Sequence, residues 1–166
     1  MAPIMRRFRR RAKLEPLAES ERTGPFAAFV CALDGLPAAH ALRGALDGCF
    51  GSDILTRRSK ALVFAVVARA LGDLRFERDA TAMALEAGLE RSDLDEILAH
   101  LTSPRLDATE RIIVPFARET VWYRPAQIQR RAREVQDALR PDQFAELIGV
   151  ASLANAVGRL GLLVDE

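Results

Sequence analysis

The chain has 166 residues, a length that fits a single domain with a substantial core. Its formal net charge of +1 gives no overall field that would favour nucleic acid or a membrane surface. Hydrophobic residues make up 49% of the chain but aromatic residues only 6%, so we predict a core of closely packed helices rich in alanine, leucine and valine.

The first segment, residues 1–22, is polar and charged. Six basic residues lie between Arg6 and Lys13, and no apolar stretch follows them. We therefore expect a flexible, solvated basic tail on a cytoplasmic protein, without a secretory signal and without a nucleic-acid or membrane partner. The alternative is an anion or nucleic-acid site, formed by this tail together with a segment that contains Arg124, Arg130, Arg131 and Arg133.

Prolines and glycines divide the remainder, residues 23–166, into helices. Proline is favoured in the first turn of a helix and glycine just past the last turn. The expected helices cover residues 25–34, 37–48, 56–71, 73–88, 92–101, 107–121, 125–139 and 141–163. No segment alternates with a period of two, and no apolar run reaches the length of a membrane span. The predicted fold class is therefore all-α, a bundle of about seven or eight helices.

Capping side chains support several of these boundaries. Thr56 and Asp73 stand where the third and fourth helices should begin. Asp107 and Glu110 have the spacing of a capping box, and the segment 92–95 has a weaker version of it.

The last predicted helix is rich in small side chains, with glycine at positions 149, 158 and 161. Glycine costs roughly 1 kcal/mol relative to alanine inside a helix, so its repeated use predicts close approach of another helix. Asn155 lies among these glycines and needs hydrogen-bond partners if it is buried.

The order of four segments, 57–72, 84–89, 106–111 and 154–160, resembles the alkylhydroperoxidase D-like (carboxymuconolactone decarboxylase-like) family. The resemblance covers about residues 36–164. It implies the multi-helix bundle of that antioxidant family. It also implies an oligomer, either a trimer-based homo-oligomer or a hetero-oligomer with a related subunit.

The residues that carry the family's redox chemistry are missing. Active members use a Cys-x-x-Cys pair, a histidine and a glutamate. The resemblance places the cysteine positions on Asp73 and Phe76, the histidine position on Ala80 and the glutamate position on Ala61. Asp73 and Phe76 cannot form a disulfide, and the alanines at the histidine and glutamate positions have no group that could transfer a proton. The chain is therefore expected to be a non-redox binding or structural subunit.

The alternative to a binding or structural subunit is an enzyme that catalyses a different reaction in the same pocket. A thiol-independent activity, such as that of a lactone decarboxylase, would use polar groups near the former redox site. The candidate pocket residues are Asp73, Phe76, Glu77, Asp79 and Ala80. Alternating charges in this segment also fit a solvated helix face or a subunit contact.

The two cysteines and two histidines complete the candidate groups. Cys31 and Cys49 could act as a relocated thiol peroxidase pair only if their helices bring the sulfurs together, and buried inert thiols are the simpler interpretation. His40 and His100 have no paired ligands at metal spacing, so we expect no metal and no cofactor.

Overall fold

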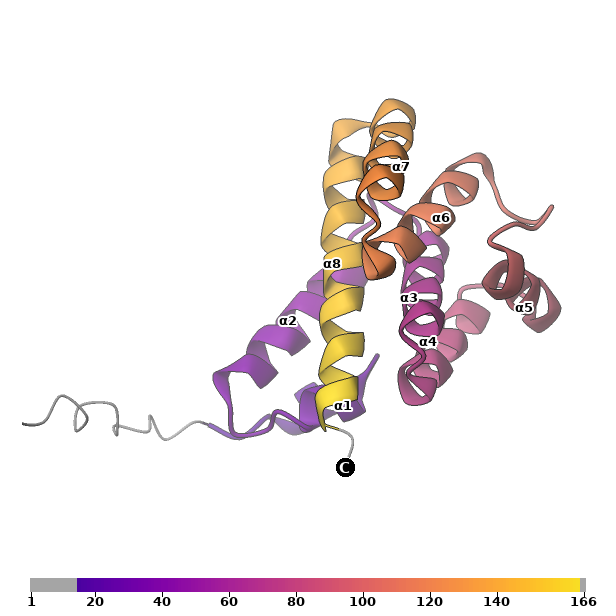
Figure 1. Cartoon of the computed structure of the whole chain (residues 1–166). Coiled ribbons are helices and arrows are strands. Elements are labelled where there is room, and N and C mark those ends of the chain that lie inside the picture. Colours follow the sequence, from indigo (N-terminus) through magenta and orange to yellow (C-terminus); the bar gives the residue numbers. More distant parts are fainter. Residues whose placement is uncertain (1–14, 165–166) are drawn as a thin grey trace, which may run out of the picture.

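The structure, a computed structural model, describes residues 15–164, and this part of the chain contains eight α-helices and no strand (Figure 1). The elements are the short 3-10 helix η2 (Glu19–Arg22) and the helices α1 (Ala27–Cys31), α2 (Pro37–Gly51), α3 (Arg57–Leu71), α4 (Leu74–Glu86), α5 (Arg91–His100), α6 (Ala108–Trp122), α7 (Pro125–Ala138) and α8 (Pro141–Val164). The all-α prediction and the predicted number of helices are confirmed for these residues.

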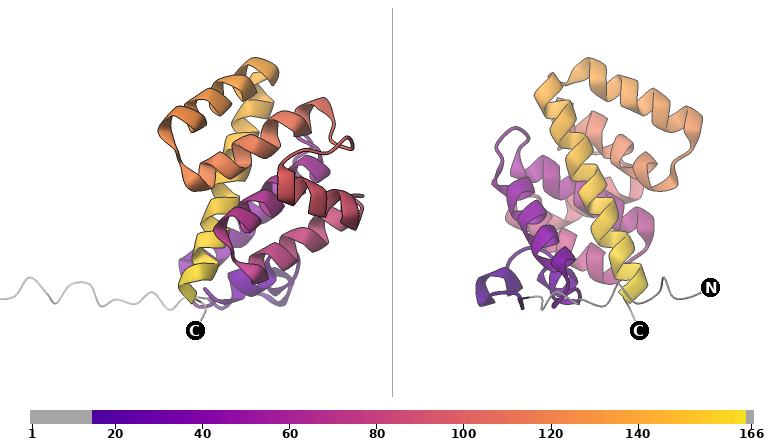
Figure 2. Two further views of the ribbon diagram at one scale, coloured as in Figure 1. Left: turned by 45° about the vertical axis from the view of Figure 1, so that its right-hand side comes forward. Right: turned by 90° about the vertical axis from the view of Figure 1, so that its left-hand side faces the viewer.

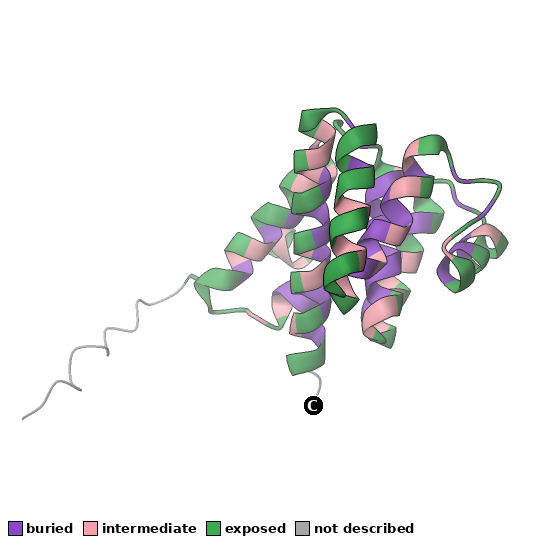
Figure 3. Ribbon diagram, turned by 45° about the horizontal axis from the view of Figure 1, so that its top comes forward, coloured by how far each residue is buried: buried purple, intermediate pink, exposed green. Residues whose placement is uncertain are grey.

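Helix α3 is the centre of the molecule. Every residue from Ser59 to Ala68 is buried, because α4, α6 and α8 pack around it on different sides (Figures 2 and 3). The predicted caps hold the helix at both ends. The Thr56 side chain accepts a hydrogen bond from the Ser59 amide, and Gly72 ends the helix with a left-handed φ of 75°.

The core contains more aromatic packing than the composition predicted. Phe26 stacks on Phe64 with ring centroids 4.9 Å apart, and Phe76 lies 5.2 Å from Phe26 and 5.8 Å from Phe29. The chain has 8 phenylalanines, and four of their rings meet at one place between α1, α3 and α4. The predicted core rich in alanine, leucine and valine therefore also contains a cluster of four phenylalanine rings.

Two of the three glycines in α8 permit the close helix approach that the sequence predicted. A Cβ atom at Gly158 would lie 2.8 Å from the Phe76 ring, and one at Gly161 would lie 2.6 Å from the Phe29 ring. Gly149 differs, because an added Cβ there meets no atom within 4 Å. Close packing inside the chain therefore explains Gly158 and Gly161 but not Gly149.

Alanine substitutions at these glycines should have opposite effects. Gly158→Ala forces a methyl group against Phe76 and should lower the free energy of unfolding by about 2 kcal/mol. Gly149→Ala adds only helix propensity and should raise the free energy of unfolding by about 1 kcal/mol. Urea unfolding of both variants measures the two effects, and an equal sign for both would contradict the packing of α8.

Residues Pro141–Leu163 of α8 are long and apolar enough to cross a membrane by length and composition alone. Core helices of soluble proteins meet the same criterion, and α8 packs against α3 along its buried face. The expectation that the chain has no membrane partner stays a prediction.

Candidate functional site

The four positions where the family resemblance places redox residues lie in the packed interior. Ala61, Phe76 and Ala80 have no exposed surface. Asp73 is also buried, and its carboxylate accepts hydrogen bonds from the amides of Arg75 and Phe76, 3.0 and 2.9 Å away. Asp73 thus caps α4 as the sequence predicted, and the phenylalanine cluster occupies the interior beside it.

The five candidate pocket residues do not line one cavity. Phe76 and Ala80 face the core, whereas Glu77 forms a two-point ion pair with Arg69 at 2.7 and 2.8 Å. Asp79 points to another side of the helix and pairs with Arg78 at 3.2 Å. The reason is helical geometry: α4 turns about 100° per residue, so positions 77 and 79 lie on different faces. The structure brings together no group of carboxylates at this site.

Cys49 is a poor nucleophile in this environment. Burial raises the pKa of its thiol to about 11, against the opposing effect of the Lys60 ammonium nearby. Since the thiolate is the reactive form, Cys49 is almost entirely protonated at neutral pH. No disulfide joins it to Cys31, whose sulfur instead lies 3.9 Å from the Arg22 carbonyl oxygen.

Lys60, beside Cys49, is a fully buried cation with a complete set of partners. Its ammonium donates to the Cys49 carbonyl at 2.8 Å and to the Ser52 carbonyl, and it pairs with Glu146 of α8 at 2.9 Å. The other carboxylate oxygen of Glu146 accepts a hydrogen bond from the Leu55 amide. Burial disfavours the charged form of Glu146, but hydrogen bonds led by those from Ser52 and Lys60 hold its pKa below the usual range. This cluster joins α2, α3 and α8, and it leaves no donor of Lys60 for a substrate.

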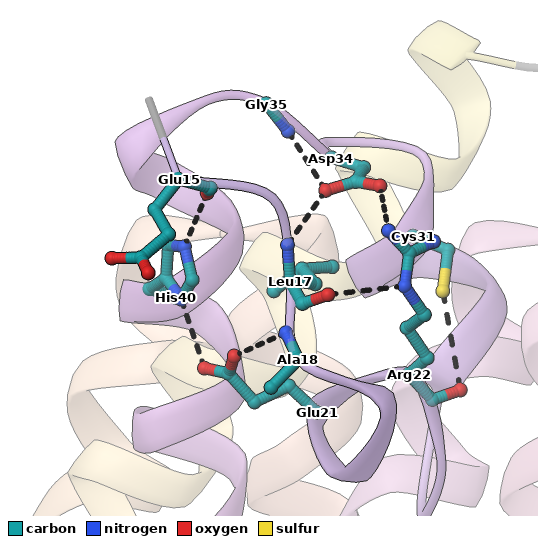
Figure 4. Close-up of polar contacts among 9 residues, drawn as sticks. All are labelled: Glu15, Leu17, Ala18, Glu21, Arg22, Cys31, Asp34, Gly35 and His40. Carbon is teal, nitrogen blue, oxygen red and sulfur yellow. Dashed lines mark hydrogen bonds and ion pairs between the residues drawn. The ribbon is translucent and has the colours of Figure 1, made fainter. Parts of the chain in front are cut away.

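Part of the segment predicted as a tail is docked on the domain. Leu17 is buried, and its amide donates to Asp34 at 2.9 Å; the other carboxylate oxygen of Asp34 pairs with Arg22 (Figure 4). The prediction of a tail over residues 1–22 is thus wrong for residues 15–22, because Leu17 supplies an apolar anchor and the charges there pair with opposite charges. Residues 1–14 lie outside the described residues.

His40 holds the docked segment through both ring nitrogens. Its Nδ1 lies 2.8 Å from a Glu21 carboxylate oxygen and its Nε2 lies 3.0 Å from the Glu15 carbonyl oxygen (Figure 4). These acceptors favour the imidazolium, so the hydrogen bond to the Glu15 carbonyl and then that to Glu21 raise the pKa of His40. His40 is therefore a satisfied histidine rather than a metal ligand. Among the described residues, no three His, Cys, Asp or Glu side chains gather as a metal site.

Docking of residues 15–22 should depend on pH through His40. A raised folded-state pKa means that the stabilisation is complete below the unfolded value of about 6.5 and is lost as pH rises through the higher folded value. The Ala18 amide donates to Glu21, so its hydrogen exchange should report on the docking. As pH rises, its exchange rate should increase by more than the intrinsic rate of an unprotected amide increases over the same pH range. NMR titration of the His40 ring measures the pKa, and Glu21→Gln should lower it. Titration of His40 below its ordinary value would contradict this account.

A mainly apolar cleft lies elsewhere, between α6, α7 and α8. At one end of the molecule α7 leads from the end of α6 back to the start of α8, and α8 then runs along the molecule to the opposite end (Figure 2). The cleft has a volume of about 470 Å³, within the range of small-molecule sites. It is lined by Phe116, Thr120, Tyr123, Ile128, Ala132, Ile148, Ala151, Ser152, Asn155 and Arg159.

Three polar side chains of α8, those of Ser152, Asn155 and Arg159, stand in this mainly apolar cleft. The Asn155 amide donates to the Thr120 hydroxyl at 2.8 Å and to the Ala151 carbonyl at 2.9 Å. Its Oδ1 atom is buried and accepts no hydrogen bond from the described residues. Arg159, one helical turn further, is the only charged side chain in the lining. Sequence reasoning identified Asn155 as a residue that needs partners but did not find the cleft.

The Arg-rich segment is largely neutralised by nearby acids. Arg124 pairs with the buried carboxylate of Glu119 and holds its pKa below the usual range. Both Arg130 and Arg131 lie within ion-pair distance of Glu134. Trp122 is half exposed between the guanidinium groups of Arg118 and Arg124 rather than in the core. These pairs argue against a strong anion site on this surface.

Comparison with known proteins found no matching family model, no matching curated protein and no matching solved structure.

Proposed function

We propose that the chain is a non-redox binding protein, and that the cleft between α6, α7 and α8 is its binding site. The cleft itself carries this proposal. It combines a mainly apolar wall with a small number of polar groups, and this is the composition that ligand sites use for affinity and orientation. The resemblance to the alkylhydroperoxidase D-like family would then be one of scaffold and not of chemistry.

Enzymatic alternatives have less support. General acid–base catalysis needs a group that can gain and lose a proton near the working pH. Among the residues that line the cleft, Arg159 is permanently charged, no carboxylate, histidine or cysteine accompanies it, and the one other ionisable group, Tyr123, is 70% exposed to solvent. The raised pKa of Cys49 likewise disfavours a thiol peroxidase. A carrier, sensor or structural subunit fits these residues better than a decarboxylase.

Self-association belongs to the same proposal. Leu74 and Leu85 border a surface hollow on α4, and Leu74 is 81% exposed. Covering them in a trimer-based homo-oligomer, or with a related subunit in the cytoplasm, would remove apolar surface from water. Native mass spectrometry of the intact chain measures the assembly, and a monomer at micromolar concentration would contradict self-association.

Binding of an uncharged dye tests the site without assuming a ligand charge. We expect N-phenyl-1-naphthylamine to bind with an increase in fluorescence and a stoichiometry of one. Ser152→Trp places an indole at an exposed position of the cleft wall and should weaken dye binding by about tenfold or more. Ala145→Trp is the matched control, since Ala145 is exposed on the same helix outside the cleft. Equal dye binding by both variants would refute the proposed site.

A further inference from the structure

We infer that the cleft binds a fatty-acid-like carboxylate. Such a ligand has an unbranched apolar chain, and a hydroxyl or amide N–H group lies close to its carboxylate. This inference rests on the proposed function, because it names the ligand class of the same cleft. Three features of the described residues carry it: an arginine with no acidic partner among them, a buried oxygen with no donor among them, and an elongated apolar wall.

Arg159 supplies the contact for the carboxylate. Its one hydrogen bond within the described residues is a long one, 3.4 Å to the Val121 carbonyl oxygen, and no described carboxylate pairs with it. The arginines near the end of α6 differ, because Arg118 and Arg124 both pair with Glu119. An unpaired guanidinium beside apolar surface matches a single planar anion, to which it can donate two parallel hydrogen bonds.

Asn155 has a side-chain oxygen that requires a hydrogen-bond donor, close to the place where a ligand carboxylate would contact Arg159. Both interactions of its amide nitrogen are made within the protein, with Thr120 and Ala151, and this fixes the orientation of the side chain. The Oδ1 atom that remains is buried and can only accept. Asn155 and Arg159 are four residues apart on α8, so about 6 Å of helix separates them. A ligand hydroxyl or amide N–H close to the carboxylate would satisfy Oδ1 while the carboxylate contacts Arg159.

The remaining wall accommodates an extended chain. The cleft residues of α8 run from Ile148 to Arg159, a rise of about 16 Å along the helix. Ile128 and Ala132 of α7 and Phe116 of α6 complete the apolar surface. A hydrocarbon chain that starts at the Arg159 end would replace water along this length. A single cation in the lining also favours one negative charge over the several charges of a nucleotide.

Titration calorimetry with three related ligands tests the inference. We expect decanoate to bind the full chain about tenfold or more tightly than 1-decanol, and 3-hydroxydecanoate to bind more tightly still. Arg159→Gln should remove the preference for decanoate and leave 1-decanol binding unchanged. Arg133→Gln, an exposed arginine outside the cleft, is the matched control and should change neither affinity. Asn155→Leu should remove only the advantage of the hydroxyl, with thermal unfolding as the check that the variant is folded.

Equal affinities for decanoate and 1-decanol, unaffected by Arg159→Gln, would overturn the ligand class while leaving a binding cleft. Failure of all three ligands and of the uncharged dye would overturn the proposed function as well. A dimer in sedimentation that Ser152→Trp converts to a monomer would show that a second copy fills the cleft, which also overturns the inference.

Discussion

Replacement of Lys60 by methionine is expected to lower the free energy of unfolding by about 3–5 kcal/mol. The substitution keeps the volume of the buried side chain, but it leaves Glu146 charged and without its cation in the interior. It also removes the donor that serves the carbonyl groups of Cys49 and Ser52. Urea unfolding followed by circular dichroism measures the loss.

Two comparisons separate this loss from a general effect of removing a charge. In the double variant Lys60→Met with Glu146→Leu, neither partner remains charged, and much of the stability should return. Arg91→Met breaks an exposed pair with Asp95 on α5 and should cost less than about 0.5 kcal/mol. Similar losses for Lys60→Met and Arg91→Met would contradict the role assigned to the buried cluster.

Phe76→Ala should be comparably damaging, with a loss of about 3–5 kcal/mol in the free energy of unfolding. The Phe76 ring is fully buried and contacts the rings of Phe26, Phe29 and Phe64, so its removal leaves a cavity between three helices. Denaturant titration of the variant against unaltered protein gives the value.

Leu74→Ala is the control, because Leu74 lies two residues earlier on α4 and is largely exposed. It should change the stability of the monomer by less than about 0.5 kcal/mol. A Phe76→Ala variant as stable as Leu74→Ala would mean that position 76 faces a cavity, as an active site would require, and not a packed core.

Helix boundaries were predictable where a local interaction determines them. Thr56 and Asp73 cap their helices, and Asp107 and Glu110 form the expected reciprocal box. The expected cap at Ser92 was wrong: α5 already begins at Arg91, and Asp95 pairs with that arginine instead. The Arg91–Asp95 pair is also local, with i,i+4 spacing, but the spacing alone does not show whether Asp95 will pair with Arg91 or complete a capping box with Ser92.

The docked N-terminal segment and the cleft were not predictable in this way. His40 meets the carbonyl group of Glu15 across 25 positions of sequence, and the Asn155 amide meets Thr120 across 35. The cleft depends on how three helices pack, and its side chains are dispersed from Phe116 to Arg159. The one available signal was Asn155, a polar residue in an apolar, glycine-containing helix. Position 76 shows the opposite case, since an apolar phenylalanine already agrees with the buried position that the structure gives it, while the loss of redox chemistry stays a prediction.

Methyl NMR of isoleucine-labelled protein, titrated with decanoate, tests the central claim most directly. The account predicts saturable shifts at Ile128 and Ile148, which line the cleft, and little change at Ile54, near the Lys60 cluster, or at Ile97 in the core. Ser152→Trp should abolish these shifts and Ala145→Trp should not. Shifts centred on Ile54, or no shift at any isoleucine, would contradict a binding site between α6, α7 and α8.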